Sequence, residues 1–264
     1  MRAFAFPWAI SLALAAAAVP ASAVPPRAAS LNLCTDELLL LLARPEQIVS
    51  VTHLSQDRRE SPLWKRARAY PRNDGGLAEV APLKPDIVLA MGGGARDRIG
   101  IGRRLGIRVV DLPFPQSLAD MRANIATVAR ALGRRGAGAR LIEEIARLER
   151  GAPARARDAI WLGGGGLSVP AEGLAAQWMR LAGMRQRELE HDRATLETLL
   201  VRPPEILLRS DYRAGQFSGG QRWLGHPLVA RVRGAEELRT DGRRWTCMGP
   251  LLVPEMARLR EELR

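Results

Sequence analysis

The chain has 264 residues, 47% of them hydrophobic, which permits one large domain or two lobes with separate cores and excludes a disordered chain. Its formal net charge of +12 comes almost entirely from arginine, because Lys65 and Lys84 are its only lysines. The arginines are scattered through every segment instead of lying in one run or alternating with aromatic residues. The charge therefore does not predict a nucleic-acid-binding surface.

The N-terminus has the layout of a secretory signal peptide. Arg2 is followed by an uncharged apolar stretch and then by the small-residue cleavage motif Ala21-Ser22-Ala23. The alternative is a membrane anchor, but Pro7 and Pro20 bracket an apolar run too short to span a bilayer comfortably. We expect residues 1–23 to be removed and the mature protein to be exported to the periplasm in soluble form.

Short aliphatic runs alternate with helical patterns in the first half of the mature chain. The expected strands and helices are strands 29–33, 47–51, 86–90 and 108–112, and helices 35–42 and 95–105. Strands that alternate with helices predict a parallel sheet whose two faces are covered.

Two helices with no strand between them then follow. The first begins at Ser117, which has capping-box spacing to Asp120, and the second runs to about Arg150. The alternation resumes afterwards with strands 159–162 and 205–208 and helices 172–181 and 254–262. This order predicts an α/β fold with two Rossmann-like lobes, each with a parallel sheet, joined by a single long connector helix. The predicted divisions are signal peptide 1–23, N-terminal lobe 24–133, connector helix 134–152 and C-terminal lobe 153–264.

The two predicted lobes contain similar segments. Residues 79–94 read EVAPLKPDIVLAMGGG and residues 197–212 read ETLLVRPPEILLRSDY. Each segment has a glutamate, an apolar turn, a proline and an acidic residue before a short aliphatic run. We interpret them as equivalent parts of two lobes built on one plan.

Glycine runs follow a predicted strand in each lobe, at 92–94 and 163–166. A glycine turn at a helix N-terminus can bind phosphate, but neither run has the third glycine of a dinucleotide fingerprint or the Gly-Lys-Ser/Thr of a phosphate loop. Open parallel sheets bind ligands beyond the carboxyl ends of their strands. We therefore expect Met91, Gly92 and Gly93 to line a ligand cleft opposite residues 163–167, with a simple tight turn as the alternative.

The whole layout resembles the helical-backbone class of periplasmic substrate-binding proteins, which serve ABC importers of cobalamin, haem and ferric siderophores. The resemblance covers nearly all of the mature chain. It is carried by the runs NLCTD at 32–36, LKPDIVL at 83–89, LGIRVV at 105–110, LAGM at 181–184, RPPEILL at 202–208 and WTCMGP at 245–250.

The resemblance implies partners for the protein. An acidic residue at the tip of each lobe docks on arginines of the membrane permease. Glu197, seven positions before Pro204, is the matching residue of the C-terminal lobe. Glu79, six positions before Pro85, is the candidate of the N-terminal lobe, with Ala78 as the alternative occupant of the family position. The alternative is that both are solvated glutamates, favoured near the positive end of a helix dipole. The implied partners are the importer permease with its ATPase and a small metal chelate, with no nucleic acid and no membrane contact except through the permease. We expect a monomer without a resident cofactor.

A planar macrocycle or chelate calls for aromatic and soft side chains at the cleft. The candidates are Trp64, Tyr70, Met91, Tyr212 and Trp245. His191 is a further candidate, as an axial ligand to haem iron or as a polar loop residue. The chain has three isolated histidines, so no zinc or manganese site is predicted.

The chain has two cysteines, Cys34 and Cys247, which fall in different predicted lobes. An oxidising compartment favours a disulfide between them. Two alternatives remain open, namely separate buried thiols, and thiols at the cleft that bind the ligand.

No catalytic motif is found. The sequence has neither a Gly-x-Ser-x-Gly elbow nor a His-Glu-x-x-His motif, so we expect a binding protein and not an enzyme. The alternative is an exported Rossmann-like enzyme that acts on a nucleotide or sugar, with Asp97 and Asp111 as its titratable pair.

Overall fold

The computed structural model describes residues 24–92, 96–216, 218–230, 232 and 234–264. The expected signal peptide and Gly93 lie outside this part of the chain. The boundaries of the lobes stay a prediction, and the elements are given below with the bounds that the structure gives them.

The N-terminal lobe contains a five-stranded sheet in the order β3-β2-β1-β4-β5, and every pairing in it is parallel. Its strands are β1 (Ala28–Ser30), β2 (Ile48–Thr52), β3 (Arg72–Asn73), β4 (Ile87–Met91) and β5 (Arg108–Leu112). Its helices are α1 (Leu33–Leu42), α2 (Trp64–Ala67), α3 (Leu77–Val80) and α4 (Arg96–Arg104), with short 3-10 turns η1 (Pro45–Gln47), η2 (His53–Gln56) and η3 (Ala81–Leu83). The central strands β1 and β4 are almost entirely buried, as a sheet covered on both faces requires.

The C-terminal lobe contains a four-stranded sheet in the order β7-β6-β8-β9, also with parallel pairings throughout. Its strands are β6 (Arg157–Leu162), β7 (Met184–Gln186), β8 (Ile206–Ser210) and β9 (Glu236–Thr240). Its helices and 3-10 turns are α7 (Leu174–Leu181), α8 (Leu196–Val201), α9 (Gly219–Leu224), α10 (Pro227–Ala230), α11 (Leu252–Glu262), η4 (Gly164–Gly166), η5 (Glu190–Asp192) and η6 (Gly242–Trp245). The predicted α/β architecture with two parallel sheets is confirmed.

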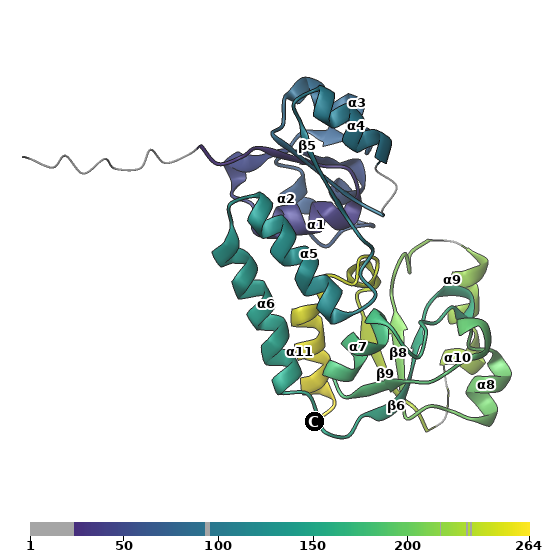
Figure 1. The fold of residues 1–264 in the computed structure, drawn as a ribbon. Coiled ribbons are helices and arrows are strands. Elements are labelled where there is room, and N and C mark those ends of the chain that lie inside the picture. The colour runs from purple at the N-terminus through teal and green to yellow at the C-terminus, as the bar shows by residue number, and fades with distance from the viewer. Residues whose placement is uncertain (1–23, 93–95, 217, 231, 233) are drawn as a thin grey trace, which may run out of the picture.

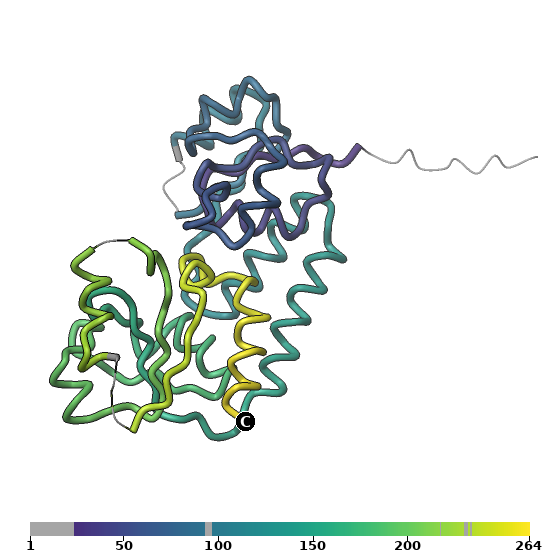
Figure 2. Tube along the Cα trace, turned by 180° about the vertical axis from the view of Figure 1, so that it is seen from behind, coloured from purple at the N-terminus to yellow at the C-terminus, as the bar shows by residue number. Residues whose placement is uncertain are grey.

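Helices α5 (Leu118–Ala131) and α6 (Arg135–Arg150) lie between the two sheets in the chain. Ser117 caps α5, since its hydroxyl accepts a hydrogen bond from Asp120 N at 3.1 Å. Helix α6 starts at the base of the N-terminal lobe and runs down the side of the C-terminal lobe (Figure 1), and α11 lies beside it near the C-terminus (Figure 2).

One apolar core is continuous across both lobes. It includes fully buried side chains from α1, α5, α6 and α7, among them Leu39, Ile125, Ile145 and Trp178. Each sheet also has a smaller apolar cluster of its own. The cluster around Val88 belongs to the N-terminal sheet, and the cluster around Leu207 belongs to the C-terminal sheet. The connector helix therefore packs into the shared core instead of bridging solvent, which limits independent motion of the lobes.

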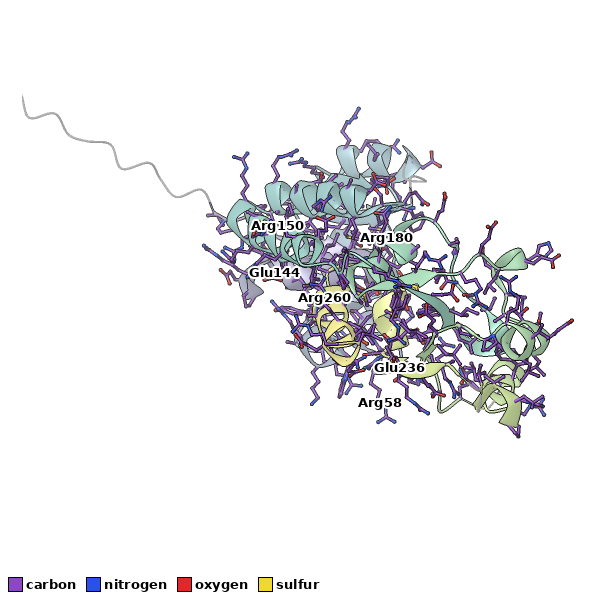
Figure 3. The ribbon with its side chains drawn as sticks, turned by 90° about the horizontal axis from the view of Figure 1, so that it is seen from below. Arg58, Glu144, Arg150, Arg180, Glu236 and Arg260 are labelled. Atoms are coloured by element: carbon purple, nitrogen blue, oxygen red, sulfur yellow. A yellow bond between two sulfur atoms is a disulfide. The ribbon has the colours of Figure 1, made fainter. Side chains whose placement is uncertain are left out.

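Part of the arginine excess has a structural role. Helix C-termini leave carbonyl groups without partners, and arginine side chains reach several of them here. Arg260 donates to Leu148 O at the end of α6 and to Leu181 O at the end of α7, and Arg134 donates to Leu42 O at 3.1 Å at the end of α1. Other arginines, such as Arg150 at the end of α6 and Arg180 in α7, lie on separate elements (Figure 3).

In the described part of the chain, no helix combines the length and the apolar character needed to cross a membrane.

Candidate functional site

The N-terminal wall of the site is built at the start of α1. Asn32 caps this helix, because its Oδ1 accepts from Cys34 N at 3.1 Å and from Thr35 N at 2.9 Å. The same side chain donates to Met91 O, 3.4 Å away at the end of β4. A single asparagine thus fixes Cys34 and the end of β4 next to each other, beyond the carboxyl edge of the sheet.

A glycine at position 92 lets an aromatic ring approach this edge. Gly92 has a φ of +123°, and its N donates to Leu112 O at 3.0 Å. A Cβ there would lie 3.2 Å from the Phe114 ring. Phe114 is 61% exposed, which is high for an aromatic ring and marks it as free to contact a ligand.

The C-terminal wall has two parts. One is the loop before α7, in which Gly173 has a φ of +94°. The other follows η6 and contains Thr246, Cys247 and Met248. The indole of Trp178 donates to Met248 O at 2.8 Å and holds this second segment against α7.

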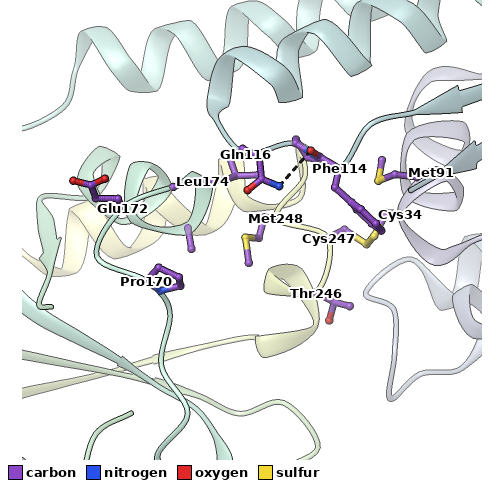
Figure 4. A pocket seen from close by; sticks show the side chains of 13 residues that line it. Cys34, Met91, Phe114, Gln116, Pro170, Glu172, Leu174, Thr246, Cys247 and Met248 are labelled. Carbon is purple, nitrogen blue, oxygen red and sulfur yellow. Dashed lines mark hydrogen bonds between the residues drawn. A yellow bond between two sulfur atoms is a disulfide. The ribbon is translucent and has the colours of Figure 1, made fainter. Parts of the chain in front are cut away.

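These walls enclose a cavity of about 330 Å³ between the lobes (Figure 4). Its lining is mainly apolar and rich in sulfur. The residues that give it this character are Cys34, Met91 and Phe114 from the first half of the chain and Leu174, Cys247 and Met248 from the second. The volume lies at the lower end of the range for small-molecule sites.

The two cysteines form a disulfide, Cys34–Cys247, which links residues 213 positions apart and lines the cavity. Among the described residues there are no free cysteines. The structure therefore combines two of the alternatives left open by the sequence, since the pair is disulfide-bonded and also lies at the cleft. The bond joins the two lobes covalently at the floor of the site.

A buried carboxyl lies one helical turn beyond the disulfide. Glu37 Oε1 accepts from Leu251 N at 3.1 Å, and a Cβ on Gly249 would lie 2.3 Å from the same oxygen. Burial raises the pKa of Glu37 to about 7, although the hydrogen bond from Leu251 and the positive charge of Arg244 act in the opposite direction. The neighbouring Asp36 is also buried, and burial raises its pKa against the hydrogen bonds that it accepts from Thr52.

The lobes also meet at a second place. Tyr212 Oη donates to Glu60 Oε2 at 2.7 Å, and the Arg213 guanidinium pairs with the same carboxylate. Partial burial, followed by the hydrogen bond to Glu60, raises the pKa of Tyr212. Arg243 adds a hydrogen bond to Arg58 O at 2.7 Å. We call the Glu60–Tyr212–Arg213 group the second lobe contact.

Three of the expected ligand residues are found at or beside the cavity. Cys34 and Met91 line it, and Gly92 supports Phe114 at its edge. Gly93 is not among the described residues. The cavity is also lined by residues that were not predicted from the sequence, namely Phe114, Gln116, Leu174, Thr246 and Met248. The signal for Phe114 was available, because it follows the carboxyl end of an expected strand.

The other expected ligand residues lie elsewhere. Trp245 is a core residue, since it is 4% exposed, packs against Trp161 and donates to Thr240 Oγ1 at 2.8 Å, so its assignment to the cleft is corrected. Tyr212 belongs to the second lobe contact. The guanidinium of Arg68 lies over the ring of Trp64, which is in α2. Tyr70 packs against the core, and His191 is exposed in η5.

The second glycine run does not form the C-terminal wall as expected. Gly164 and Gly165 pack against Gly220 at the start of α9, and Gly166 leaves no room for a Cβ beside Ala194 O, 2.3 Å away. These glycines thus permit close backbone packing within the lobe, and the loop before α7 takes the place assigned to them.

The two candidate docking glutamates are both exposed in first helical turns. Glu197 lies in α8 just after its cap Thr195, and Glu79 lies in α3. Their hydrogen bonding differs, because the Glu79 carboxylate accepts a hydrogen bond from Asp74 N in the segment just before α3. Within the described residues, no group of three or more histidine, cysteine or acidic side chains is placed to hold a metal ion.

A model of a known protein family matches most of the chain. Residues 29–236 match the family model described as Periplasmic binding protein. The chain belongs to the periplasmic binding protein family. No curated protein sequence matches it.

Solved structures share the fold of this periplasmic binding protein. The haem-binding protein HutB of Vibrio cholerae superimposes with a TM-score of 0.69 at 17% identity, covering 90% of this chain and 98% of its own. The haem-binding protein BhuT in complex with two hemes superimposes with a TM-score of 0.66 at 21% identity, covering 90% of this chain and 99% of its own. The haem-binding protein RhuT from Roseiflexus sp. RS-1 in apo form superimposes with a TM-score of 0.65 at 20% identity, covering 90% of this chain and 97% of its own. At these identities the likeness shows the fold.

Proposed function

We propose that this protein is the substrate-binding component of an ABC importer, which captures a metal chelate between its lobes and delivers it to a membrane permease. The observation that carries the proposal is the cavity of about 330 Å³ at the carboxyl ends of β4 and β5, closed from the other side by the second lobe. Ligands of open parallel sheets bind at this place. A sulfur-rich, apolar lining suits a polarisable ligand.

Family and fold support the same role. Periplasmic binding proteins are substrate-binding components of transport systems, and the solved structures described above include haem-binding proteins. The proposed partners are therefore a permease, its ATPase and a small chelate, and the proposed state is a monomer without a resident cofactor. The proposed location is the periplasm, reached through the leader at residues 1–23.

The enzyme alternative has less support. It assigns the chemistry to Asp97 and Asp111, which lie in α4 and β5, and neither residue lines the cavity. A reaction on a nucleotide or sugar needs its titratable groups at the bound substrate. We therefore assign no reaction to the protein.

Ligand binding gives the first test. A chelate present at 100 times its Kd is expected to add about 2.7 kcal/mol of stability and to raise the Tm by roughly 5–10 °C. Purified protein would be heated with haemin, cyanocobalamin, ferrichrome, ferrioxamine B or ferric enterobactin, with ATP as the comparison. Stabilisation by ATP and by none of the chelates would contradict the proposal and favour the enzyme.

Docking on the permease gives a separate test, at Glu197. The Glu197→Lys change is expected to reduce chelate uptake by reconstituted importer at least about tenfold, because it reverses a charge that orients the complex. Its Kd for the chelate should stay within about twofold of wild type, since α8 lies outside the cavity lining.

The matched control for this test is Glu190→Lys, an equally large charge change at an exposed residue of the same lobe. It should leave uptake near the wild-type rate. A weakened Kd in Glu197→Lys, or equal losses of uptake in the two variants, would show that Glu197 is not a docking residue.

A further inference from the structure

The charge of the cavity lining differs sharply from that of the chain. The protein has 40 lysines and arginines, yet the described residues that line the cavity include none of them. The one charged side chain in this lining is the carboxylate of Glu172, at the rim (Figure 4). An anionic group brought into this cavity would lose its hydration without meeting a cation among the described lining residues, and this is costly in an apolar setting.

The lining also offers little that could coordinate a metal. The histidines and tyrosines of the chain do not line it, and the sulfurs of Cys34 and Cys247 are bound to each other. Met91 and Met248 supply thioethers, which are soft ligands better suited to Cu(I) than to ferric iron. Apart from the Glu172 carboxylate at the rim, the described lining residues supply no ligand suited to ferric iron, so a chelate held here must bring nearly all of its own metal ligands.

The polar groups at the cavity are suited to hydrogen-bond donors on the ligand. Gln116 contributes a side-chain amide, Glu172 a carboxylate and Thr246 a hydroxyl. Each of these can accept a hydrogen bond, and the carboxylate can only accept. A ligand that carries amide N–H groups or an ammonium group meets this pattern, whereas a ligand edged with carboxylates does not.

We infer that the cavity selects an uncharged or cationic chelate whose metal is already fully coordinated, such as an amide-bearing corrinoid or a hexadentate hydroxamate siderophore. Haem, which carries two carboxylates and needs an axial ligand, and the highly anionic catecholate siderophores are disfavoured. This inference rests on the proposed function, and it divides the possible chelates by charge and by coordination instead of by family likeness.

The test measures Kd values for a panel of probes by quenching of tryptophan fluorescence. Cyanocobalamin and ferrichrome are neutral, ferrioxamine B is cationic, and haemin and ferric enterobactin are anionic. At least one of the three neutral or cationic probes is expected to bind about 100-fold more tightly than either anionic probe. This ratio corresponds to a difference of about 2.7 kcal/mol in binding free energy.

Two variants test the charge directly. Glu172→Gln removes the carboxylate and is expected to weaken ferrioxamine B about fivefold while leaving the matched neutral hydroxamate ferrichrome unchanged, a size typical of one exposed charge pair. Gln116→Arg adds a cation and is expected to tighten haemin about fivefold, again with little effect on ferrichrome.

The possible outcomes separate this inference from the proposed function. Haemin that binds as tightly as the neutral probes, with a Soret band typical of an iron–side-chain bond, would overturn the inference and leave the proposed function standing. Binding of no chelate at all by the wild-type protein would overturn the proposed function and the inference together.

Discussion

Loss of the Cys34–Cys247 disulfide is expected to lower the free energy of unfolding by about 4 kcal/mol. The bond closes a loop across 213 residues, and a cross-link of such a long loop removes much of the conformational freedom of the unfolded chain. The bond also joins the two lobes at the floor of the cavity, so its loss weakens their mutual orientation as well as the global stability.

Urea denaturation of the oxidised protein, the dithiothreitol-reduced protein and the Cys34→Ser/Cys247→Ser variant measures this effect. The double variant is the matched control for the reductant, because its transition should not move when dithiothreitol is added. A loss of less than about 1 kcal/mol on reduction would show that noncovalent contacts alone hold the lobes together in the unfolding experiment.

The sequence was sufficient for the architecture because its signals are local. Strand β5 was predicted over residues 108–112, and it forms over Arg108–Leu112. Strand β5 lies at an edge of its sheet, and so do the strands that the prediction missed, which are β3, β7 and β9. These three differ from β5 because β3 and β7 are very short and β9 is rich in charged residues. An edge strand is covered on fewer sides, so its side chains can be polar, as the sequence EELRT of β9 illustrates. An aliphatic run is then no longer a reliable sign of a strand.

The site was predicted only in part because it depends on how the lobes face each other. Met91 was found by a rule that needs the sheet alone, namely that ligands bind at the carboxyl ends of parallel strands. Cys34 was placed at the cleft only as one of the alternatives for the two cysteines. The pairing of Glu60 with Tyr212 joins residues 152 positions apart, and no local pattern reports it. Trp245 shows the same limit, because an aromatic residue in a cleft motif and one in the core look alike in sequence.

The disulfide and the second lobe contact act in different ways on the site. The disulfide is a covalent link beside the cavity, whereas the contact made by Glu60, Tyr212 and Arg213 consists of hydrogen bonds and an ion pair. Noncovalent contacts of this kind contribute about 1–3 kcal/mol each and can open without unfolding the protein. Any widening of the cleft for a large chelate is therefore expected at the second lobe contact.

The stability of this protein is also expected to depend on pH through Glu37. The pKa of this carboxyl is about 7 in the folded protein, against 4.5 for an exposed glutamate, because burial disfavours its charged form. Between these pH values the folded protein keeps the proton that the unfolded chain has already released. The free energy of unfolding therefore falls as pH rises from about 4.5 to about 7, by about 3 kcal/mol in total, and this contribution then levels off.

The Glu37→Gln variant should remove this contribution. Glutamine keeps a carbonyl oxygen that can accept from Leu251 N, but it has no proton to release. We expect the variant to match wild type near pH 4.5 and to be more stable by about 3 kcal/mol at pH 8, measured by urea denaturation at both values. Burial also raises the pKa of Asp36, so a fall of the same sign should remain in the variant.

Glu46→Gln is the matched control, because Glu46 is exposed in η1, a few residues beyond the end of α1. It removes one carboxyl from the same part of the chain without changing a buried group, and its stability should follow that of wild type across the pH range. If Glu37→Gln differed from wild type by the same amount at pH 4.5 and at pH 8, its effect would come from packing against Gly249 and Leu251. In that case the buried carboxyl would not control the pH dependence of stability, and the contact between α1 and the 249–251 segment would contribute the same stability at both pH values.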